Sequence, residues 1–316
     1  MTRVLAIALD AAEPNLIERW MEDGSLPALQ ALRSRGAYGR LASTAEWLPD
    51  SCWPTFYASQ NPAQHSFYNY LVWNPNEMRT EPPSLDRLPK PFWHAFKSDS
   101  DPRAIILDIP YIYNAERFNG KEITGFAPHA TLVPMMGYPP EFVSWVKKRF
   151  GEQLISYERY GLQSRQEFRA TRDELVRITR TVGDFFLGMI GSERWDLFLA
   201  AFFTVHRAGH KLWALQNIKS PISPSEKEEL SDALRQVYIA CDREVGRLVN
   251  AIDPDTAVLV FSLHGMGDNT SRTVLFPEML RRVLHDLPPA TLNPGPGLID
   301  RIRELVPLEL RHRVKS

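Results

Sequence analysis

Cysteine is scarce in this chain, since Cys52 and Cys241 are the two cysteines among 316 residues. Two cysteines so far apart cannot build a disulfide framework, and they match no zinc-finger spacing. We therefore expect both to be small buried side chains. With 44% hydrophobic residues, the chain has enough apolar material for a sizeable core.

Long apolar runs and a strong net charge are also missing. The first apolar run, Val4–Leu9, is shorter than the core of a signal peptide, and no later run is long enough to span a bilayer. The formal net charge is -1 and the sequence pI is about 6.7, so no overall field attracts nucleic acid or an anionic membrane. We expect a cytoplasmic protein whose partner is a small molecule, not a nucleic acid polymer or a membrane.

Short apolar runs alternate with long helical patterns, which predicts an α/β fold with a predominantly parallel sheet sandwiched between helices. The expected strands are Val4–Leu9, 104–108, 196–203 and Ala257–Phe261, with a further strand at 38–42. The expected helices are 26–35, 53–59, 165–190 and 225–251. Residues 74–140 are rich in proline and in loop-forming residues, so we expect a small inserted cap there on a single domain spanning 1–316.

Side chains that can bind a metal follow three of the expected strands. Asp10 comes directly after the first strand, His206 and His210 follow the strand at 196–203, and His264 follows the last strand. Ligands of open α/β sheets bind beyond the carboxyl ends of the strands, so we expect these side chains to meet there. A spacing of four residues puts His206 and His210 on one face of a helical turn.

The chemistry of these side chains favours a transition metal. Imidazole and carboxylate together suit Zn²⁺, with Mn²⁺ or iron as other candidates, better than Mg²⁺ or Ca²⁺, which prefer oxygen ligands. Two histidines on a helix can also simply pack against it or cap it. Their convergence with Asp10 and His264 at equivalent strand ends favours the metal site, and we predict a metal-dependent hydrolase with one or two ions.

Several motifs occur in a characteristic order: Leu5-Ala-Ile-Ala-Leu-Asp10, Leu26-Pro-Ala-Leu-Gln-Ala-Leu32, Trp53-Pro-Thr-Phe and Phe261-Ser-Leu-His-Gly-Met266. In this order they resemble the type I phosphodiesterase and nucleotide pyrophosphatase branch of the alkaline phosphatase superfamily. The resemblance runs from about Val4 to about Arg282. It implies a mixed or parallel sheet between helices, and hydrolysis of phosphate or sulfate esters with paired metals and a Ser or Thr nucleophile.

The resemblance assigns the metal ligands residue by residue, with two departures. Asp10 matches the first metal carboxylate, His210 the histidine of an Asp-x-x-x-His pair, and His264 the histidine of an Asp-His-Gly element. His206 stands where the aspartate of the pair is expected, and Leu263 replaces the aspartate before His264. Fewer anionic ligands neutralise less of the charge of a divalent ion, so one ion, or a softer second site, is an alternative to two.

The nucleophile also departs from the family pattern. The family hydroxyl precedes Trp53, but direct counting reaches Pro49, which has no hydroxyl. If a short local deletion is allowed, Ser51 becomes the predicted catalytic nucleophile, at a helix start where backbone amides would favour a phosphate. Serine at such a position more often caps the helix. Asp50 is an alternative metal ligand, and Thr55 is a weaker substitute for the nucleophile.

Three further side chains are predicted to bind the substrate. They are His129 in the expected cap, Trp53 and Thr55, although an aromatic residue such as Trp53 can instead be buried. Related enzymes supply one more histidine ligand downstream, and neither His285 nor His312 has the expected setting. His129 is therefore an alternative ligand that could close the site.

These observations predict a hydrolase of phosphodiesters or phosphomonoesters that acts through a covalent intermediate. Its substrate would be a small phosphate or sulfate ester. The altered metal motifs and the uncertain nucleophile leave two alternatives, a catalytically weakened binding protein on the same fold, or a phosphoryl or sulfuryl transferase.

Overall fold

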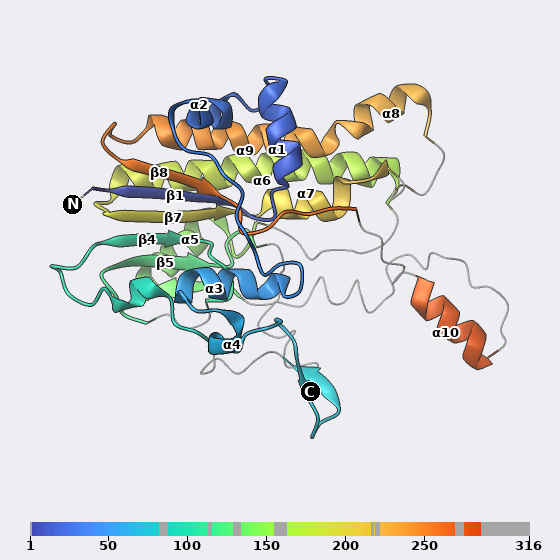
Figure 1. Cartoon of the computed structure of the whole chain (residues 1–316), viewed down its shortest axis with the longest axis horizontal. Coiled ribbons are helices and arrows are strands. Elements are labelled where there is room, and N and C mark those ends of the chain that lie inside the picture. Colours follow the sequence, from blue (N-terminus) through green and yellow to red (C-terminus); the bar gives the residue numbers. More distant parts are fainter. Residues whose placement is uncertain are drawn as a thin grey trace.

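The computed structural model describes residues 2–81, 88–112, 116–128, 134–154, 163–215, 218, 222–268 and 275–285. A six-stranded sheet forms its centre, in the order β6-β5-β4-β7-β1-β8 (Figure 1). The strands are β1 (Val4–Leu9), β4 (Ala104–Leu107), β5 (Gly120–Thr124), β6 (Met136–Tyr138), β7 (Leu197–Phe202) and β8 (Ala257–Phe261). All neighbours are parallel except β6, which runs antiparallel to β5. The predicted α/β class with a mostly parallel sheet is confirmed.

Helices cover both faces of this sheet (Figure 1). The helices are α1 (Pro14–Glu22), α2 (Pro27–Arg35), α3 (Cys52–Ala58), α4 (Pro62–His65), α5 (Pro140–Phe150), α6 (Arg165–Ser192), α7 (Thr204–Leu212), α8 (Pro224–Ser231), α9 (Ala233–Asn250) and α10 (Phe276–His285), with 3-10 turns η1 (Pro49–Ser51) and η3 (Phe92–Ala95). Among the described residues, no helix combines the length and the apolar character needed to cross a bilayer.

The alternation of side chains along β1 divides the core into two layers. Leu5, Ile7 and Leu9 join the larger apolar cluster, which contains the buried faces of α6 and α9. Ala6 and Ala8 point the other way, into a cluster with Trp53 of α3 and other aromatic residues. Because alanine is small, the bulky rings of this second layer pack directly against the strand. The sheet is therefore buried on both faces, as its unbroken apolar strands predict.

Two secondary-structure predictions, the strand at 38–42 and the single helix at 225–251, differ from the structure. The expected strand at 38–42 is wrong, because this segment is exposed and Tyr38 and Arg40 instead bind Glu18 of α1 through side-chain hydrogen bonds. The helix expected at 225–251 is two helices, α8 and α9, separated at Asp232. A periodic apolar pattern continues through this break, so the pattern did not reveal it.

Part of the expected cap at 74–140 belongs to the main sheet. β4, β5 and β6 all fall within this range and pair in sequence order at one side of the sheet. A separate hairpin of β2 (Val72–Asn74) and β3 (Arg79–Glu81) projects from the body, where it is largely exposed (Figure 1). Strand β5 reads Gly-Lys-Glu-Ile-Thr, which carries little of the apolar signal of a buried strand. That the remaining loops of 74–140 form a cap over the substrate site stays a prediction.

The start of α2 is capped by a residue from a distant helix. Its N-cap residue, Leu26, makes no side-chain hydrogen bond, so the first amides of the helix need other acceptors. Asp242 of α9 supplies them, since its two carboxylate oxygens accept from the amides of Ala28 at 3.1 Å and Leu29 at 2.8 Å. Burial raises the pKa of Asp242, and the two hydrogen bonds oppose that rise.

We expect Asp242→Ala to lower the free energy of unfolding by about 1–3 kcal/mol, because it leaves two amides at a partly buried helix start without acceptors. Asp242→Asn keeps one side-chain oxygen and should lose roughly half as much. Urea unfolding of the three proteins at one pH measures the difference. Equal stability of Asp242→Ala and the wild type would show that this contact does not stabilise α2.

Candidate metal centre

Three adjacent strands bring the predicted metal ligands to one edge of the sheet. β1 lies between β7 and β8 and is parallel to both, so the carboxyl ends of the three strands lie side by side. Asp10 follows β1, and its amide donates to the carbonyl of Phe202 at the end of β7. His206 lies on α7, which begins two residues after β7, and His264 lies in the loop after β8.

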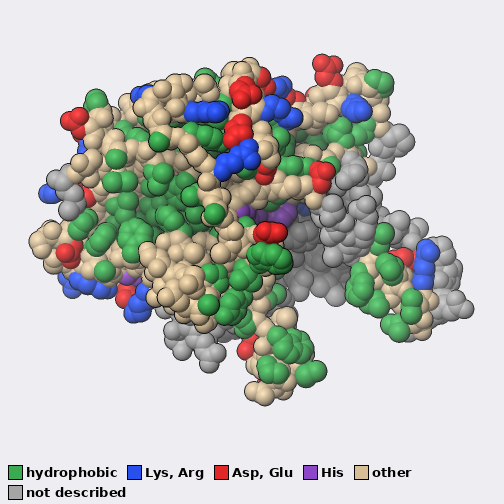
Figure 2. All heavy atoms as spheres, in the orientation of Figure 1, with side chains coloured by type: hydrophobic (Ala, Val, Ile, Leu, Met, Phe, Trp, Pro, Cys, Tyr) green, Lys and Arg blue, Asp and Glu red, His purple; other side chains and the backbone are tan. Residues whose placement is uncertain are grey.

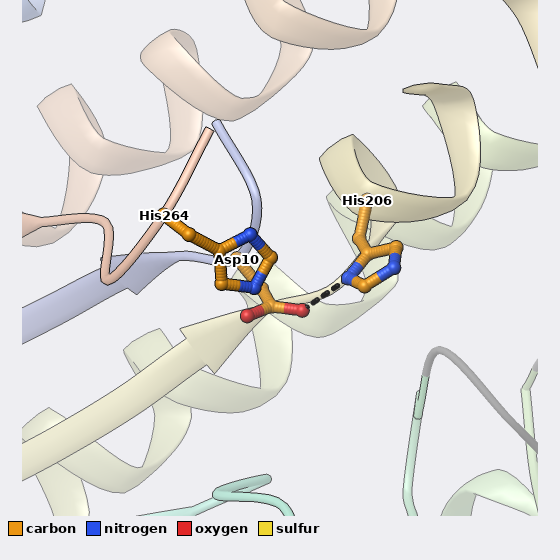
Figure 3. A group of neighbouring side chains, drawn as sticks. All are labelled: Asp10, His206 and His264. Carbon is orange, nitrogen blue, oxygen red and sulfur yellow. Dashed lines mark hydrogen bonds and ion pairs between the residues drawn. The ribbon is translucent and has the colours of Figure 1, made fainter. Parts of the chain in front are cut away.

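Asp10, His206 and His264 form the core of the candidate site (Figure 3). One possible ligand atom from each lies within 4.8 Å of the others, and this is the one such group in the described part of the chain. The Nδ1 atom of His206 lies 2.6 Å from Oδ2 of the Asp10 carboxylate. Asp10 is buried, while both histidines are half-buried. Figure 2 shows histidine side chains at the bottom of a recess near the middle of the molecular face.

His210 lies beside this group but is not one of its members. Its Nε2 atom is 2.9 Å from Nε2 of His206, and the two rings are 4.8 Å apart between centroids. His210 is exposed on one side, yet desolvation by the surrounding protein lowers its pKa to about 4, and electrostatic interactions with His206, Arg207 and Lys211 lower it further. The ring of His210 is therefore neutral at physiological pH.

The indole of Trp53 fixes the orientation of the Asp10 carboxylate. Its Nε1–H donates to Oδ1 of Asp10 at 2.8 Å, and the ring is buried between Phe203 and Phe261. We predicted Trp53 as a substrate contact, and the structure adds a hydrogen bond that the sequence did not reveal. Nothing in the spacing of residues 10 and 53 indicates that the two side chains meet.

Hydrogen bonds join the loops after β1 and β8, and they position His264. The Ser262 hydroxyl accepts from the amide of Ala12 at 3.1 Å and donates to the carbonyl of His264 at 2.7 Å. Glu13 accepts from the amide of Met266 at 3.2 Å. A Cβ atom on Gly265 would lie 2.2 Å from Oε2 of Glu13, so a larger residue there would have to displace this carboxylate. Sequence reasoning identified neither Ser262 nor Glu13.

The predicted nucleophile, Ser51, lies in η1, directly before α3. It is fully buried, and its hydroxyl donates to the carbonyl of Leu48 at 2.6 Å and lies 3.1 Å from the Thr44 hydroxyl. Its side chain makes no capping hydrogen bond to α3. Neighbouring Asp50, the alternative metal ligand, accepts a hydrogen bond from the Tyr111 hydroxyl at 3.0 Å. The nucleophilic role of Ser51 stays a prediction.

Of the other predicted substrate contacts, the structure describes Thr55 but not His129. The Thr55 hydroxyl lies 3.0 Å from Nε2 of His65, whose Nδ1 accepts from the amide of Phe67 at 3.0 Å, so His65 fixes this loop. His129 lies outside the described residues, as does His312. His285 ends α10, away from the three strand ends that carry the centre (Figure 1).

Asp108 is a further carboxylate at a strand end, and it stabilises a loop. Asp108 follows β4, is buried, and accepts from the amides of Phe126 at 2.9 Å and Ala127 at 2.6 Å. Burial raises its pKa to about 7, against the opposing effect of these hydrogen bonds. Asp108 therefore holds the loop after β5 in place.

The donor set at the strand ends fits a bound divalent ion. One carboxylate and two imidazoles are three protein ligands of the kind that bind zinc and other transition metals, with open positions left for water or substrate. Ligand bonds of about 2.0–2.2 Å to one ion are compatible with the observed spacing after small side-chain adjustments. Because Asp10 already contacts both Trp53 and His206, its carboxylate is oriented before an ion arrives.

Comparisons with known proteins agree with this picture of the fold. The family model described as type I phosphodiesterase / nucleotide pyrophosphatase matches residues 4–295. A crystal structure of phosphonoacetate hydrolase from Sinorhizobium meliloti 1021 with phosphonoformate is similar at a TM-score of 0.52 and 15% identity, over 90% of this chain and 62% of that one. The same enzyme with phosphonoacetate gives a TM-score of 0.48 at the same identity and coverage. This chain thus spans 62% of the length of its structural neighbour. No curated protein matches it.

Proposed function

Because the chain belongs to the type I phosphodiesterase / nucleotide pyrophosphatase family of the alkaline phosphatase superfamily, we propose that it is a metal-dependent hydrolase of small phosphate esters. The observation that supports this most directly is the meeting of Asp10, His206 and His264 at three neighbouring strand ends. The substrate is a phosphate, phosphonate or sulfate ester that enters the recess beside these residues, and the protein works in the cytoplasm.

The ion in this proposal is Zn²⁺ or another divalent transition metal held by Asp10 and the histidines. When bound, it supplies a Lewis acid that stabilises negative charge on the ester and lowers the pKa of a bound hydroxyl or water. The protein contributes the orientation of the ligands. Trp53 holds the Asp10 carboxylate, and Ser262 joins the two loops that carry Asp10 and His264.

Ser51 is our proposed nucleophile, with Thr55 as a weaker candidate. Its hydroxyl proton is engaged by the Leu48 carbonyl, so attack on phosphorus requires the side chain to turn away from that carbonyl. A catalytically weakened binding protein is the second candidate, and the buried Ser51 hydroxyl is the observation that favours it. A phosphoryl or sulfuryl transferase is the third, because the same intermediate can pass its group to an alcohol.

We expect the purified protein to release nitrophenol from bis(p-nitrophenyl) phosphate, to lose this activity on dialysis against a chelator, and to regain it when Zn²⁺ is added back. The physical reason is that charge on the ester oxygens is stabilised by the ion. Absorbance at the nitrophenolate band measures the rate.

Controls separate the three candidates. A protein that binds Zn²⁺ but hydrolyses no phosphate, phosphonate or sulfate ester would be the binding protein. Transfer to an added alcohol in large excess over release to water would identify the transferase. Chelator-resistant hydrolysis at the full rate would contradict the role of the metal.

A further inference from the structure

We propose that this centre binds one ion, through Asp10, His206 and His264, and that His210 acts through His206 instead of binding the ion itself. The inference rests on the metal-dependent function proposed above. It differs from the paired metals that the resemblance implies, and it assigns His210 the role of a positioning residue.

The first reason lies in the Asp10 carboxylate. A carboxylate can serve two ions by offering one oxygen to each. Here Oδ1 accepts the Trp53 indole N–H at 2.8 Å, deep in the aromatic layer under the site. Oδ2 is the oxygen that faces His206. Because the buried indole already engages Oδ1, we infer that Oδ2 is the oxygen that Asp10 offers to an ion shared with His206.

The second reason lies in the chemistry of the His206 ring. A neutral imidazole has one nitrogen with a free lone pair and one nitrogen that carries a proton. Nδ1 of His206 faces Asp10, and Nε2 faces His210. If Nδ1 binds the ion beside Asp10, the proton must be on Nε2, where it is donated to His210. His206 can then bind a single ion.

The third reason concerns His210 itself. To accept the Nε2–H of His206 at 2.9 Å, His210 uses the lone pair of its own Nε2 and carries its proton on Nδ1. Neither nitrogen is then free to bind metal. Without metal, His206 donates from Nδ1 to Asp10 and accepts at Nε2 from His210. On metal binding, each ring moves its proton to its other nitrogen, so the pair gains and loses none.

The described part of the chain offers a second ion few other ligands. Leu263, directly before His264, is partly buried against the aromatic layer and supplies only hydrocarbon. Within the described ranges, no second group of three histidine, cysteine or acidic side chains has the spacing of a metal site. A residue that donates to or accepts from a metal-bound histidine commonly tunes metal affinity, which is the role left for His210.

Metal stoichiometry provides the first test. The full chain is stripped with a chelator, titrated with Zn²⁺ by calorimetry, and assayed for bound metal by mass spectrometry after gel filtration. We expect saturation at one ion per chain. Two ions per chain of comparable affinity, or no bound ion, would overturn the proposal.

Four variants test the role of His210. His206→Ala and His264→Ala should reduce bound zinc to background at concentrations that saturate the wild type. His210→Ala should still saturate at one ion, with affinity lower by about 10- to 100-fold. His210→Gln should recover most of that loss, since its side-chain oxygen can accept the Nε2–H of His206. Glu174→Ala, at an exposed position on α6, is the control and should bind zinc as the wild type does.

The absorption spectrum of bound Co²⁺ provides a readout that does not depend on activity. The Co²⁺ absorption bands of His210→Gln should match those of the wild type, because the ligands are unchanged. If His210→Ala loses its ion as fully as His206→Ala, and glutamine does not restore it, His210 is a ligand and the proposal is wrong. One bound ion without ester hydrolysis would leave this inference standing and reject the proposed function, while two bound ions with hydrolysis would do the opposite.

Discussion

Replacing Asp10 with asparagine is expected to remove the bound ion and to lower turnover of a phosphate diester by about a thousand-fold or more, since metal stabilisation of the transition state contributes several kcal/mol. Asparagine has the same shape as aspartate, and its oxygen can still accept the Trp53 indole N–H. The change therefore removes the negative charge while it keeps the contact that holds this part of the core. Metal analysis and the nitrophenol assay measure the two effects.

Unfolding experiments provide the control for this variant. Asp10→Asn should unfold within about 1 kcal/mol of the metal-free wild type, as a shape-conserving change that keeps its main hydrogen bond. Asp10→Ala should be less stable than Asp10→Asn, because it leaves the Trp53 indole N–H without its acceptor. Wild-type metal content and turnover in Asp10→Asn would remove Asp10 from the site and, with it, the basis for the proposed chemistry.

The largest effect on stability is expected from Phe186→Ala, which should lower the free energy of unfolding by about 3–5 kcal/mol. Phe186 of α6 is fully buried and packs edge-on against Phe202, with 5.1 Å between ring centroids. Truncation leaves a cavity between α6 and β7 and removes an aromatic pair. Such a loss is a large part of the stability of an ordinary domain.

The matched control for Phe186→Ala is Glu174→Ala, an exposed position on the same helix that should change stability by less than about 0.5 kcal/mol. Chemical unfolding followed by circular dichroism compares the two variants. A loss below about 1 kcal/mol for Phe186→Ala would mean that the core refills the space or is less tightly packed than the structure indicates. Because Phe202 ends β7 and accepts the Asp10 amide, this variant should also weaken metal binding.

The meeting of Asp10, His206 and His264 could be predicted because it follows from topology. A continuous apolar run predicts a buried strand, and a polar residue at its end must lie at the edge of the sheet. Asp10, His206 and His264 satisfy this rule, and their strands are neighbours in the structure. The rule places residues at an edge, but it does not say which strands are adjacent there. The exclusion of His210 from the group could not be predicted either, because it depends on how α7 packs and thus on which of its two histidines lies closer to Asp10.

The features that the sequence did not reveal depend on contacts between distant segments. Trp53 and Asp10, Ser262 and Ala12, and Asp242 and Leu29 are pairs joined by single hydrogen bonds, without any periodic signal. The expected strand at 38–42 failed for a related reason. Its residues have some strand character, but no apolar face that a sheet could bury, and Glu18 of α1 offers polar partners instead.

The strand order also determines when the candidate metal centre can first form. Its ligands come from positions 10, 206 and 264, and β1, which carries the first, lies between β7 and β8 in the sheet. While the ribosome is still making the chain, β1 must wait for both neighbours, the second of which ends at residue 261. The newborn N-terminal half therefore exposes an unpaired apolar strand for most of its synthesis, a state prone to aggregation. If the proposed centre binds a metal ion, the ion can enter it only after β8 has been made and has paired with β1.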